Sequence, residues 1–423
     1  MLQQNTYKYS WLNELLKTAA FILAGLYLAN CFTPLRMHYD MLRYFGIEEC
    51  MENGCPPDSA AAQDYLPYGY TALLLALSKL GILKSFTIVF VNCVYLFTGL
   101  YLIKKIFAAS MRPFLFFIVA LLNWTVMKYT VHPLSEIQFF FFSTVSLYFF
   151  YKHTQQRALA PLIFAFIFAG LAFMTRTIGV ALVPALLLGL GWEHKKELIS
   201  LIRRNKILVI LILLLIGGVF IFSKQLGLNH YTGVRSDQFK GNLTTADIIM
   251  WHFKEWSEVT LNLPFNKIEN YIPGNAAKII FIITGVCFFA WFIFTLIRSA
   301  TIPFFIKIYL LAYSAIIFYW PFYDPRFWVP VVPMGIAVIL HALFNAKRIV
   351  KLAYSLLFFV YAVFGLFSLG YLTRTSFDKK VFAKSQASGV YRNEYEIYFY
   401  GKPLSDTAKQ VDPFVIHVLK KYN

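Results

Sequence analysis

The chain has 423 residues, of which 59% are hydrophobic and only 14% are charged, and its mean hydropathy is +0.59. That apolar content excludes a soluble globular enzyme. The 39 Lys+Arg residues exceed the 21 Asp+Glu residues by 18. In a soluble protein such an excess would suggest nucleic-acid binding, but here it must first be compared with the positive-inside bias of membrane proteins.

Apolar runs bounded by charged residues predict eleven transmembrane helices. They lie near 12–31, 86–103, 113–130, 136–151, 158–174, 177–192, 206–223, 277–297, 303–321, 327–345 and 350–372. The first run is expected to be a retained anchor rather than a cleaved signal peptide, because Glu14 interrupts its basic flank and no clear A-x-A site follows it. The sequence therefore predicts an all-α polytopic membrane protein.

Charge sets the expected topology. The stretch from Leu66 to Gly81 has about sixteen residues, opens with Pro67 and carries Lys79, so we expect it to lie at the outer interface without crossing. With a cytoplasmic amino terminus, most basic residues of the loops then fall on the cytoplasmic side, as the positive-inside bias requires. The outward side holds few cations between the spans: Arg176, Arg326 and, near the end of its span, Lys128.

Two domains follow from this arrangement. A membrane domain is expected over 1–372, including the external loops 32–85 and 224–276. A short external tail follows over 373–423, and it is too short to promise an independent core. We expect the tail to pack on the external loops, and the site chemistry to lie on the same side.

Asp40 stands about ten residues beyond the first predicted span, within RMHYDMLRYF. A carboxylate beside the bilayer surface can take a proton from an acceptor hydroxyl or amine, although an ordinary solvated loop acid would occupy the same position. Further acids of this external loop offer a second carboxylate, but their spacing selects none of them: Glu48, Glu49, Glu52, Asp58 and Asp64.

Glu136 opens a predicted span within HPLSEIQFFFF, on the outer face and with His132 nearby. Its first-turn position suits the free amides and the positive end of the helix dipole, so capping alone would explain it. An ionisable group at a membrane helix end that faces a cavity is equally a site hypothesis. Both interpretations stay open at this point.

Arg176 lies between two long apolar runs, where a guanidinium at mid-membrane would cost about 2.5–3.5 kcal/mol on insertion scales. It must therefore reach the outer interface or find a partner. A phosphate headgroup is a natural partner, because a guanidinium presents a planar fork of donors that matches phosphate oxygens. Arg326, within FYDPRFWVPVVP, is placed likewise, although Asp324 could simply pair with it.

Two of the five cysteines, Cys50 and Cys55, fall in the first external loop. The residues between them include Asn53-Gly54, which favours a tight turn that could join the sulfurs in a local disulfide. Metal binding is the weaker alternative, because no further ligands stand at zinc-site spacing.

Taken in order, several segments resemble the GT-C membrane glycosyltransferases, which include protein O-mannosyltransferases and aminoarabinose transferases and use polyprenyl-phosphate sugars. The resemblance covers roughly residues 12–345 and rests on the acidic loop with Asp40 and Tyr44, LPYGYTALLLALSKLG, LSEIQFFFFSTVSLYFF, TRTIGVALVPALLLGL and YDPRFWVPVVP. It implies external loops that bear juxtamembrane helices.

The resemblance also implies roles for individual residues. Asp40 would be the general base, Arg176 and Arg326 would hold the donor phosphate, and Glu136, His132 and Tyr44 would contact substrate. The implied partners are a polyprenyl-phosphate-linked sugar donor and a lipid, glycan or protein acceptor, with no nucleic acid. The implied location is a bacterial inner membrane, with the site facing the periplasm or exterior.

No nucleotide cofactor is expected, because no Walker loop or dinucleotide fingerprint stands in a usable context. A divalent metal stays open, although Tyr39 and Met41 flank Asp40 where many mannosyl-transferring members carry two adjacent acids. Two alternative functions remain. A flippase or transporter of lipid-linked glycan would be expected to show paired repeats and interrupted helices, which we do not find. A surface-polysaccharide ligase or polymerase would share the same donor.

Overall fold

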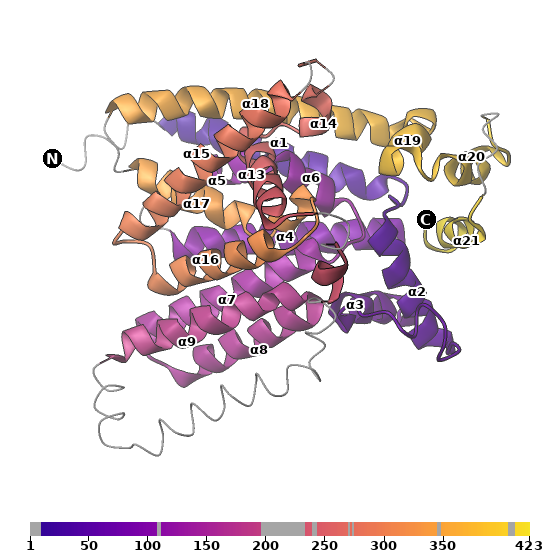
Figure 1. Ribbon diagram of the computed structural model, residues 1–423, viewed down its shortest axis with the longest axis horizontal. Helices are drawn as coiled ribbons and strands as arrows, with labels where there is room; N and C mark the ends of the chain where they lie inside the picture. The colour runs from indigo at the N-terminus through magenta and orange to yellow at the C-terminus, as the bar shows by residue number, and fades with distance from the viewer. Residues whose placement is uncertain are drawn as a thin grey trace.

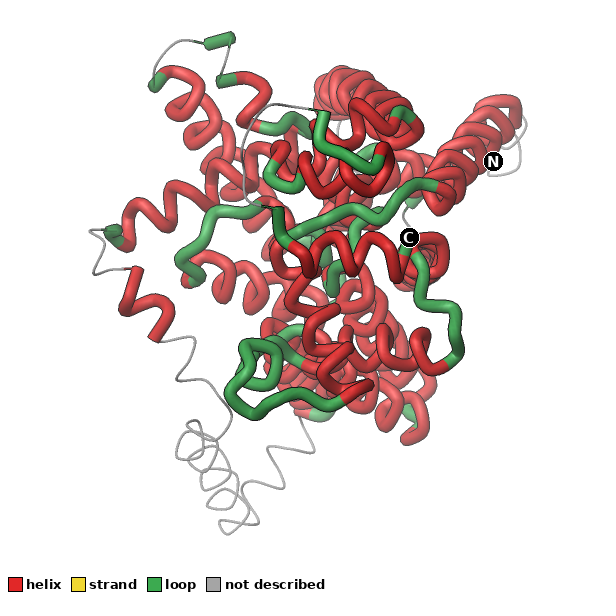
Figure 2. Tube along the Cα trace, turned by 90° about the vertical axis from the view of Figure 1, so that its right-hand side faces the viewer, coloured by secondary structure: helices red, strands yellow, loops and turns green. Residues whose placement is uncertain are grey.

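The structure is a computed structural model that describes residues 10–107, 111–195, 233–238, 243–269, 271–272, 275–344, 348–404 and 411–423. The elements of these residues are helices with no strand (Figure 2). Most of the longer helices form one bundle (Figure 1). They are α1 (Ser10–Ala29), α4 (Ser85–Ile106), α7 (Glu136–Gln156), α8 (Leu159–Thr175), α9 (Leu182–Glu193), α15 (Ala276–Arg298), α16 (Phe304–Tyr319), α17 (Val332–Phe344) and α18 (Arg348–Phe377).

The described helices include four that are long and apolar enough to cross a membrane: Trp11–Phe32, Ser85–Ile106, Ala276–Arg298 and Tyr354–Phe377. Four further apolar helices are shorter, with 10–17 residues, and lie at other predicted spans. The predicted span near 206–223 lies outside the described residues. The all-α membrane fold is thus confirmed, whereas the number of eleven spans stays a prediction.

The run near 113–130 is not the single helix that its hydropathy predicts. It forms α5 (Pro113–Leu121) and α6 (Trp124–Thr130), which are bent by 70° at a short break. Asn123 caps α6 by accepting hydrogen bonds from its free amides. The side chain of Asn262 donates to the carbonyl of residue 122 at 2.9 Å and accepts from the amide of residue 124 at 2.7 Å. These two asparagines satisfy backbone groups that the break leaves without helical partners. The run over 113–130 is therefore two helices and not the single helix that was predicted.

Short helices gather at one end of the bundle, on the right in Figure 1. They are α2 (Tyr39–Asn53), α3 (Tyr68–Lys79), α19 (Lys379–Ser385), α20 (Arg392–Tyr400) and α21 (Pro413–Tyr422). Helix α3 has 12 residues, so it reaches about 18 Å and is too short to cross a hydrocarbon layer of about 30 Å. It packs so closely on α8 that a Cβ added to Gly69 would lie 2.6 Å from the carbonyl oxygen of Met174.

The carboxyl-terminal segment packs on the loop that follows α1 and on helix α2. The amide of Met37 donates to the Tyr395 hydroxyl at 2.9 Å, and the Tyr422 hydroxyl donates to Glu48 Oε2 at 2.9 Å. The last residue, Asn423, accepts a hydrogen bond from the amide of Leu35 at 2.9 Å. The predicted domain boundary at 372 falls inside α18, which continues to Phe377, so that boundary stays a prediction.

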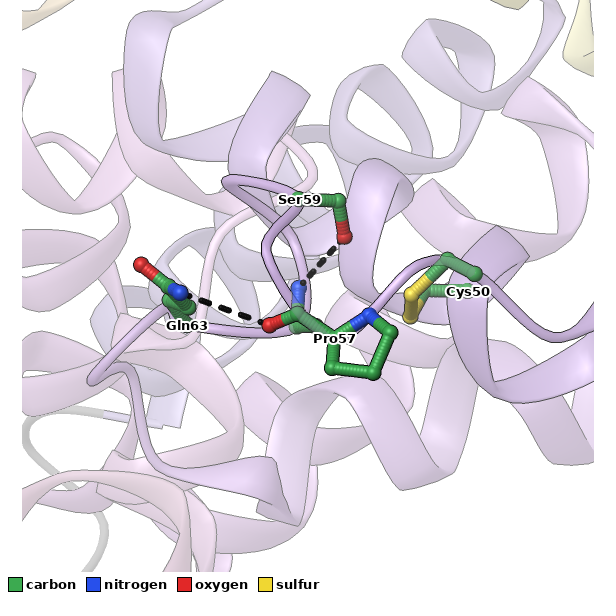
Figure 3. Close-up of a disulfide and its surroundings, with 6 residues drawn as sticks. Cys50, Pro57, Ser59 and Gln63 are labelled. Atoms are coloured by element: carbon green, nitrogen blue, oxygen red, sulfur yellow. Dashed lines mark hydrogen bonds between the residues drawn. A yellow bond between two sulfur atoms is a disulfide. The ribbon is translucent and has the colours of Figure 1, made fainter.

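Cys50 and Cys55 form the predicted disulfide, with their Cα atoms 4.9 Å apart (Figure 3). Gly54, between them, has a φ of 77°, which glycine adopts without strain. In the loop that follows, Gln63 Nε2 donates to the carbonyl of Pro57 at 3.4 Å (Figure 3). The disulfide therefore closes the end of α2, and metal binding by this cysteine pair is the alternative that the structure does not support.

Close contact between α13 (Thr245–Leu261) and α15 leads to a stability prediction. A Cβ on Gly285 would overlap the carbonyl oxygen of Phe253, so Gly285→Ala is expected to lower the free energy of unfolding by about 1–3 kcal/mol. Thermal unfolding of the purified protein in detergent measures the effect. Gly370→Ala in α18 is the matched control, since a Cβ there meets nothing within 4 Å. Equal stability of the two variants would contradict the proposed contact.

Candidate active site

Four segments meet at the end of the bundle that carries the short helices. They are the start of α2 with Asp40, the start of α7 with Glu136, the end of α8 with Arg176, and the segment from 320 to 328, which includes the 3-10 helix η5 (Pro325–Trp328) and Arg326. At α2, the His38 side chain accepts a hydrogen bond from the amide of Asp40 at 3.3 Å. This cap fixes Asp40 in the first turn of the helix.

Arg326 joins two carboxylates. Its Nη2 lies 2.5 Å from Asp40 Oδ2, and its Nε lies 2.9 Å from Asp324 Oδ2. The amide of Arg326 also donates to Asp324 Oδ1 at 2.9 Å, and the Tyr129 hydroxyl donates to the same oxygen at 3.2 Å. The pairing with Asp324 that the sequence left open therefore exists, and Asp40 shares the same guanidinium.

Arg176 continues this network toward the bundle interior. Its Nη1 pairs with Glu136 Oε1 and donates to the hydroxyl of Ser135 at 3.3 Å. Arg326 Nε lies 3.8 Å from the same oxygen of Glu136. Asp40, Arg326, Glu136 and Arg176 thus form one continuous set of ion pairs. The side chain of Glu136 is 1% exposed, whereas those of Asp40 and Asp324 are 20% and 23% exposed, so a substrate can reach Asp40 and Asp324 but not Glu136.

Arg43 is a member of the network that sequence reasoning did not single out. Its Nε and Nη2 donate to the two carboxylate oxygens of Asp64 at 2.8 and 2.7 Å, and its Nη1 lies 3.3 Å from Asp40 Oδ1. Such a two-pronged contact is the strong form of an arginine–carboxylate pair. The spacing of Asp40 and Arg43, three residues apart on one helix, was the available sequence signal.

Lys128 is a second residue whose place the sequence did not reveal. Its Nζ lies 5.0 Å from the centre of the Tyr129 ring, and no ion pair or hydrogen bond holds it among the described residues. It lies close enough to Asp324 and Arg326 to be influenced by both charges. In this network of four carboxylates and three guanidinium groups, Lys128 is the cation without a carboxylate partner in the described part of the chain.

The charges around Asp40 keep it ionised. Burial raises the pKa of Asp40, but the positive charges of Arg326 and Arg43 more than offset that effect and hold the pKa below its ordinary value. Burial and the charge of Arg326 together lower the pKa of His38, so this ring stays neutral near pH 7. At rest Asp40 is therefore a stable carboxylate and a weak base.

Tyr44 and His132 lie behind the ion pairs. The Tyr44 hydroxyl is 2.9 Å from the Ser135 hydroxyl, and burial raises the pKa of Tyr44 to about 12. His132 Nδ1 lies 2.6 Å from the carbonyl of Lys128 and contacts none of the carboxylates. Tyr44 is 4% exposed and His132 is 6% exposed. The structure thus places both as supports of the network, and direct contact of either with substrate stays a prediction.

Glu136 lies in the first turn of α7, where its negative charge suits the helix dipole, so both interpretations of this residue stay open. No side-chain hydrogen bond caps the start of α7, and the Glu136 carboxylate pairs with Arg176.

A metal centre lacks a ready ligand set, because no group of three or more His, Cys, Asp or Glu side chains that could hold an ion occurs within the described ranges. Asp40, Asp324 and Glu136 are each occupied by guanidinium groups.

Removing Glu136 should destabilise the protein. Glu136→Ala would leave Arg176 without its carboxylate in a site where the two side chains are 18% and 1% exposed, and breaking such a pair costs about 3–5 kcal/mol. Thermal unfolding in detergent measures the loss. Glu14→Ala is the control, because Glu14 pairs with Lys17 in the open and should change stability by about 0–1 kcal/mol. A loss no larger than that of the control would show that the pair is dispensable.

Comparison with known proteins gives one likeness of fold. No protein-family model matches the chain, and no curated protein sequence matches it. Among solved structures it is similar to the crystal structure of ArnT from Cupriavidus metallidurans bound to undecaprenyl phosphate. The identity is 14% and the TM-score is 0.46, over 92% of this chain and 69% of that chain. A likeness of this extent concerns the arrangement of helices and gives no residue a role.

Proposed function

We propose that this chain is an integral membrane glycosyltransferase that moves a hexosyl or pentosyl group from a polyprenyl-phosphate donor to an acceptor on the non-cytoplasmic face of the membrane. The observation that carries the proposal is the continuous network from Asp40 through Arg326 and Glu136 to Arg176. It puts a reachable carboxylate and two guanidinium groups within one site, at the end of a bundle of apolar helices.

Asp40 is the proposed general base. Its carboxylate is 20% exposed, and it can accept the proton of an acceptor hydroxyl or amine as that group attacks the anomeric carbon of the donor sugar. The bond between the anomeric carbon and the phosphate oxygen then breaks, and the polyprenyl phosphate leaves with the bonding electrons. The acceptor gains the sugar, and Asp40 holds the released proton.

Arg326, Arg176 and Lys128 are the proposed partners of the donor phosphate. Fixed cations at the leaving group lower the barrier, because negative charge develops on the phosphate as the bond breaks. Within the described residues, Arg176 contacts Glu136 and Ser135 through Nη1, and its other nitrogens can donate to a ligand. Lys128 adds an ammonium group that lies over the Tyr129 ring and forms no ion pair with a carboxylate of the described residues.

The resting ion pair between Asp40 and Arg326 adds a step to this mechanism. A phosphate that competes for Arg326 would weaken its contact with Asp40, which is 2.5 Å at rest. Because that contact helps to hold the pKa of Asp40 low, its loss would make Asp40 a better base. Donor binding would therefore prepare the carboxylate for the acceptor.

The decisive experiment offers radiolabelled polyprenyl-phosphate sugars to the purified protein in vesicles, together with lipid, glycan and peptide acceptors. Label that becomes covalently attached to an acceptor supports the proposal. Label that only crosses the bilayer would show a flippase, and growth of a polysaccharide chain would show a ligase or polymerase. Residues accessible from one side would be mapped in the same vesicles to test the periplasmic orientation.

The pH dependence of transfer should differ between the free and the donor-bound enzyme. Because the folded-state pKa of Asp40 is lowered, the stabilisation from its ion pair is present above the ordinary value of about 3.9 and is lost as the pH falls through the folded-state pKa. The acid limb of kcat/KM for the donor reports ionisation of the free enzyme, and the acid limb of kcat reports ionisation of the donor complex. The first limb should therefore lie at a lower pH than the second. Rate measurements from pH 3 to about 8 test this order, and a kcat limb at the lower pH would exclude the donor-induced release of Asp40.

A further inference from the structure

His252 and Glu255 form a buried pair that the mechanism above does not use. They stand three residues apart on α13, both side chains are fully buried, and His252 Nδ1 lies 2.8 Å from Glu255 Oε2. Burying two ionisable groups away from water is costly unless each is hydrogen-bonded. Both side chains must therefore have hydrogen-bond partners inside the protein.

The pair holds the segment from 320 to 328 at three points. His252 Nε2 donates to the carbonyl of Trp320 at 2.7 Å. The amide of Asp324 donates to Glu255 Oε1 at 2.5 Å, and the indole nitrogen of Trp328 donates to Glu255 Oε2 at 2.9 Å. The three contacts recur every four residues and cover the whole connection between α16 and η5.

The hydrogen bonds also define the charge of this clamp. A carbonyl oxygen only accepts, so the proton of His252 must stand on Nε2. The remaining proton of the pair lies between Nδ1 and Oε2, and the pair is neutral whichever atom holds it. The clamp therefore fixes the segment without adding net charge to the ion pairs of Asp40 and Arg326.

We infer that Glu255 and His252 are positioning residues, which set the place of Asp324 and Arg326 opposite Asp40; this inference rests on the proposed function. The backbone amide of Asp324 donates to Glu255. The Asp324 carboxylate accepts a hydrogen bond from the backbone amide of Arg326 and pairs with the Arg326 guanidinium. A shift at residue 324 is thus passed directly to Arg326. A misplacement of about 1 Å can cost about 10²-fold in rate.

The test compares Glu255→Gln with wild type. Glutamine keeps the size of the side chain, but in either orientation its amide nitrogen faces a donor, the backbone amide of Asp324 or the indole nitrogen of Trp328. Hydrogen exchange of the peptide covering 320–328 should become at least about ten-fold faster, and kcat should fall about 10²-fold. In addition, Asp40 should react faster with a carbodiimide, because Arg326 would no longer cover it.

Ser257→Ala is the matched control. Ser257 is also buried on α13, and its hydroxyl has no hydrogen-bond partner in the described structure, so all three readouts should stay near wild type. His252→Gln serves as a second variant if Glu255→Gln does not fold. It should loosen residues 320–328 because one amide cannot bridge Trp320 and Glu255 at once.

Unchanged exchange and carbodiimide labelling in Glu255→Gln would overturn the inference, as would faster exchange with unchanged kcat. These outcomes can be told apart from a failure of the proposed function. If the wild-type protein transfers no sugar, the proposed function fails. In that case the exchange and labelling measurements still report whether the clamp positions Arg326 against Asp40.

Discussion

Asp40→Asn is expected to lower sugar transfer by about 10²–10⁴-fold, which is the usual contribution of a positioned general base. The asparagine side chain has the same size and can still accept one hydrogen bond, but it cannot take up the acceptor proton. Undecaprenyl phosphate should still bind, because Arg176 and Lys128 are unchanged. Steady-state transfer rates and binding of undecaprenyl phosphate in nanodiscs measure the two effects separately.

The control for this variant is Asp58→Asn. Asp58 belongs to the same external loop and is exposed, but it has no part in the ion-pair network. It should transfer sugar at the wild-type rate. An Asp40→Asn protein that is folded and fully active would remove Asp40 from the role of base and with it the central element of the mechanism.

Arg326→Gln should reduce kcat by about 10²–10³-fold, the loss typical of removing one preorganised donor from a developing anion. Unlike Asp40→Asn, it should also weaken binding of undecaprenyl phosphate, because the phosphate loses a cation in the ground state as well. The variant leaves Asp40 and Asp324 without the guanidinium that joins them. Thermal unfolding must therefore be recorded beside the kinetics.

Arg392→Gln is the appropriate comparison for Arg326→Gln. Arg392 also pairs with a carboxylate, since its Nε lies 2.7 Å from Glu396 Oε1 on α20, but it lies outside the network of Asp40. Its loss should leave kcat and undecaprenyl phosphate binding near wild type. Should Arg326→Gln bind undecaprenyl phosphate as tightly as this control does, the phosphate would have to be assigned to other cations.

Local patterns in the chain were enough to indicate a helical membrane protein and to point to most of the charged residues of the site. Hydropathy is a property of each local run of residues, so the apolar helices could be found without knowing their neighbours. Charged groups next to such runs are rare because they are costly, and this rarity selected Glu136, Arg176 and Arg326. Asp40 was selected by its position just beyond the first predicted span and by the resemblance to the GT-C enzymes. The disulfide between Cys50 and Cys55 was also local, since only five positions separate the two residues.

How these charges pair could not be read from local patterns, because it depends on the packing of distant helices. Glu255 reaches the amide of Asp324 over 69 positions, and Asn262 stabilises the break before α6 over 138 positions. No local pattern encodes such contacts, because the partner of a buried polar group depends on which helices pack together. For the same reason Lys128 was only a charge near the end of a predicted span, until packing placed it beside Asp324 and Arg326.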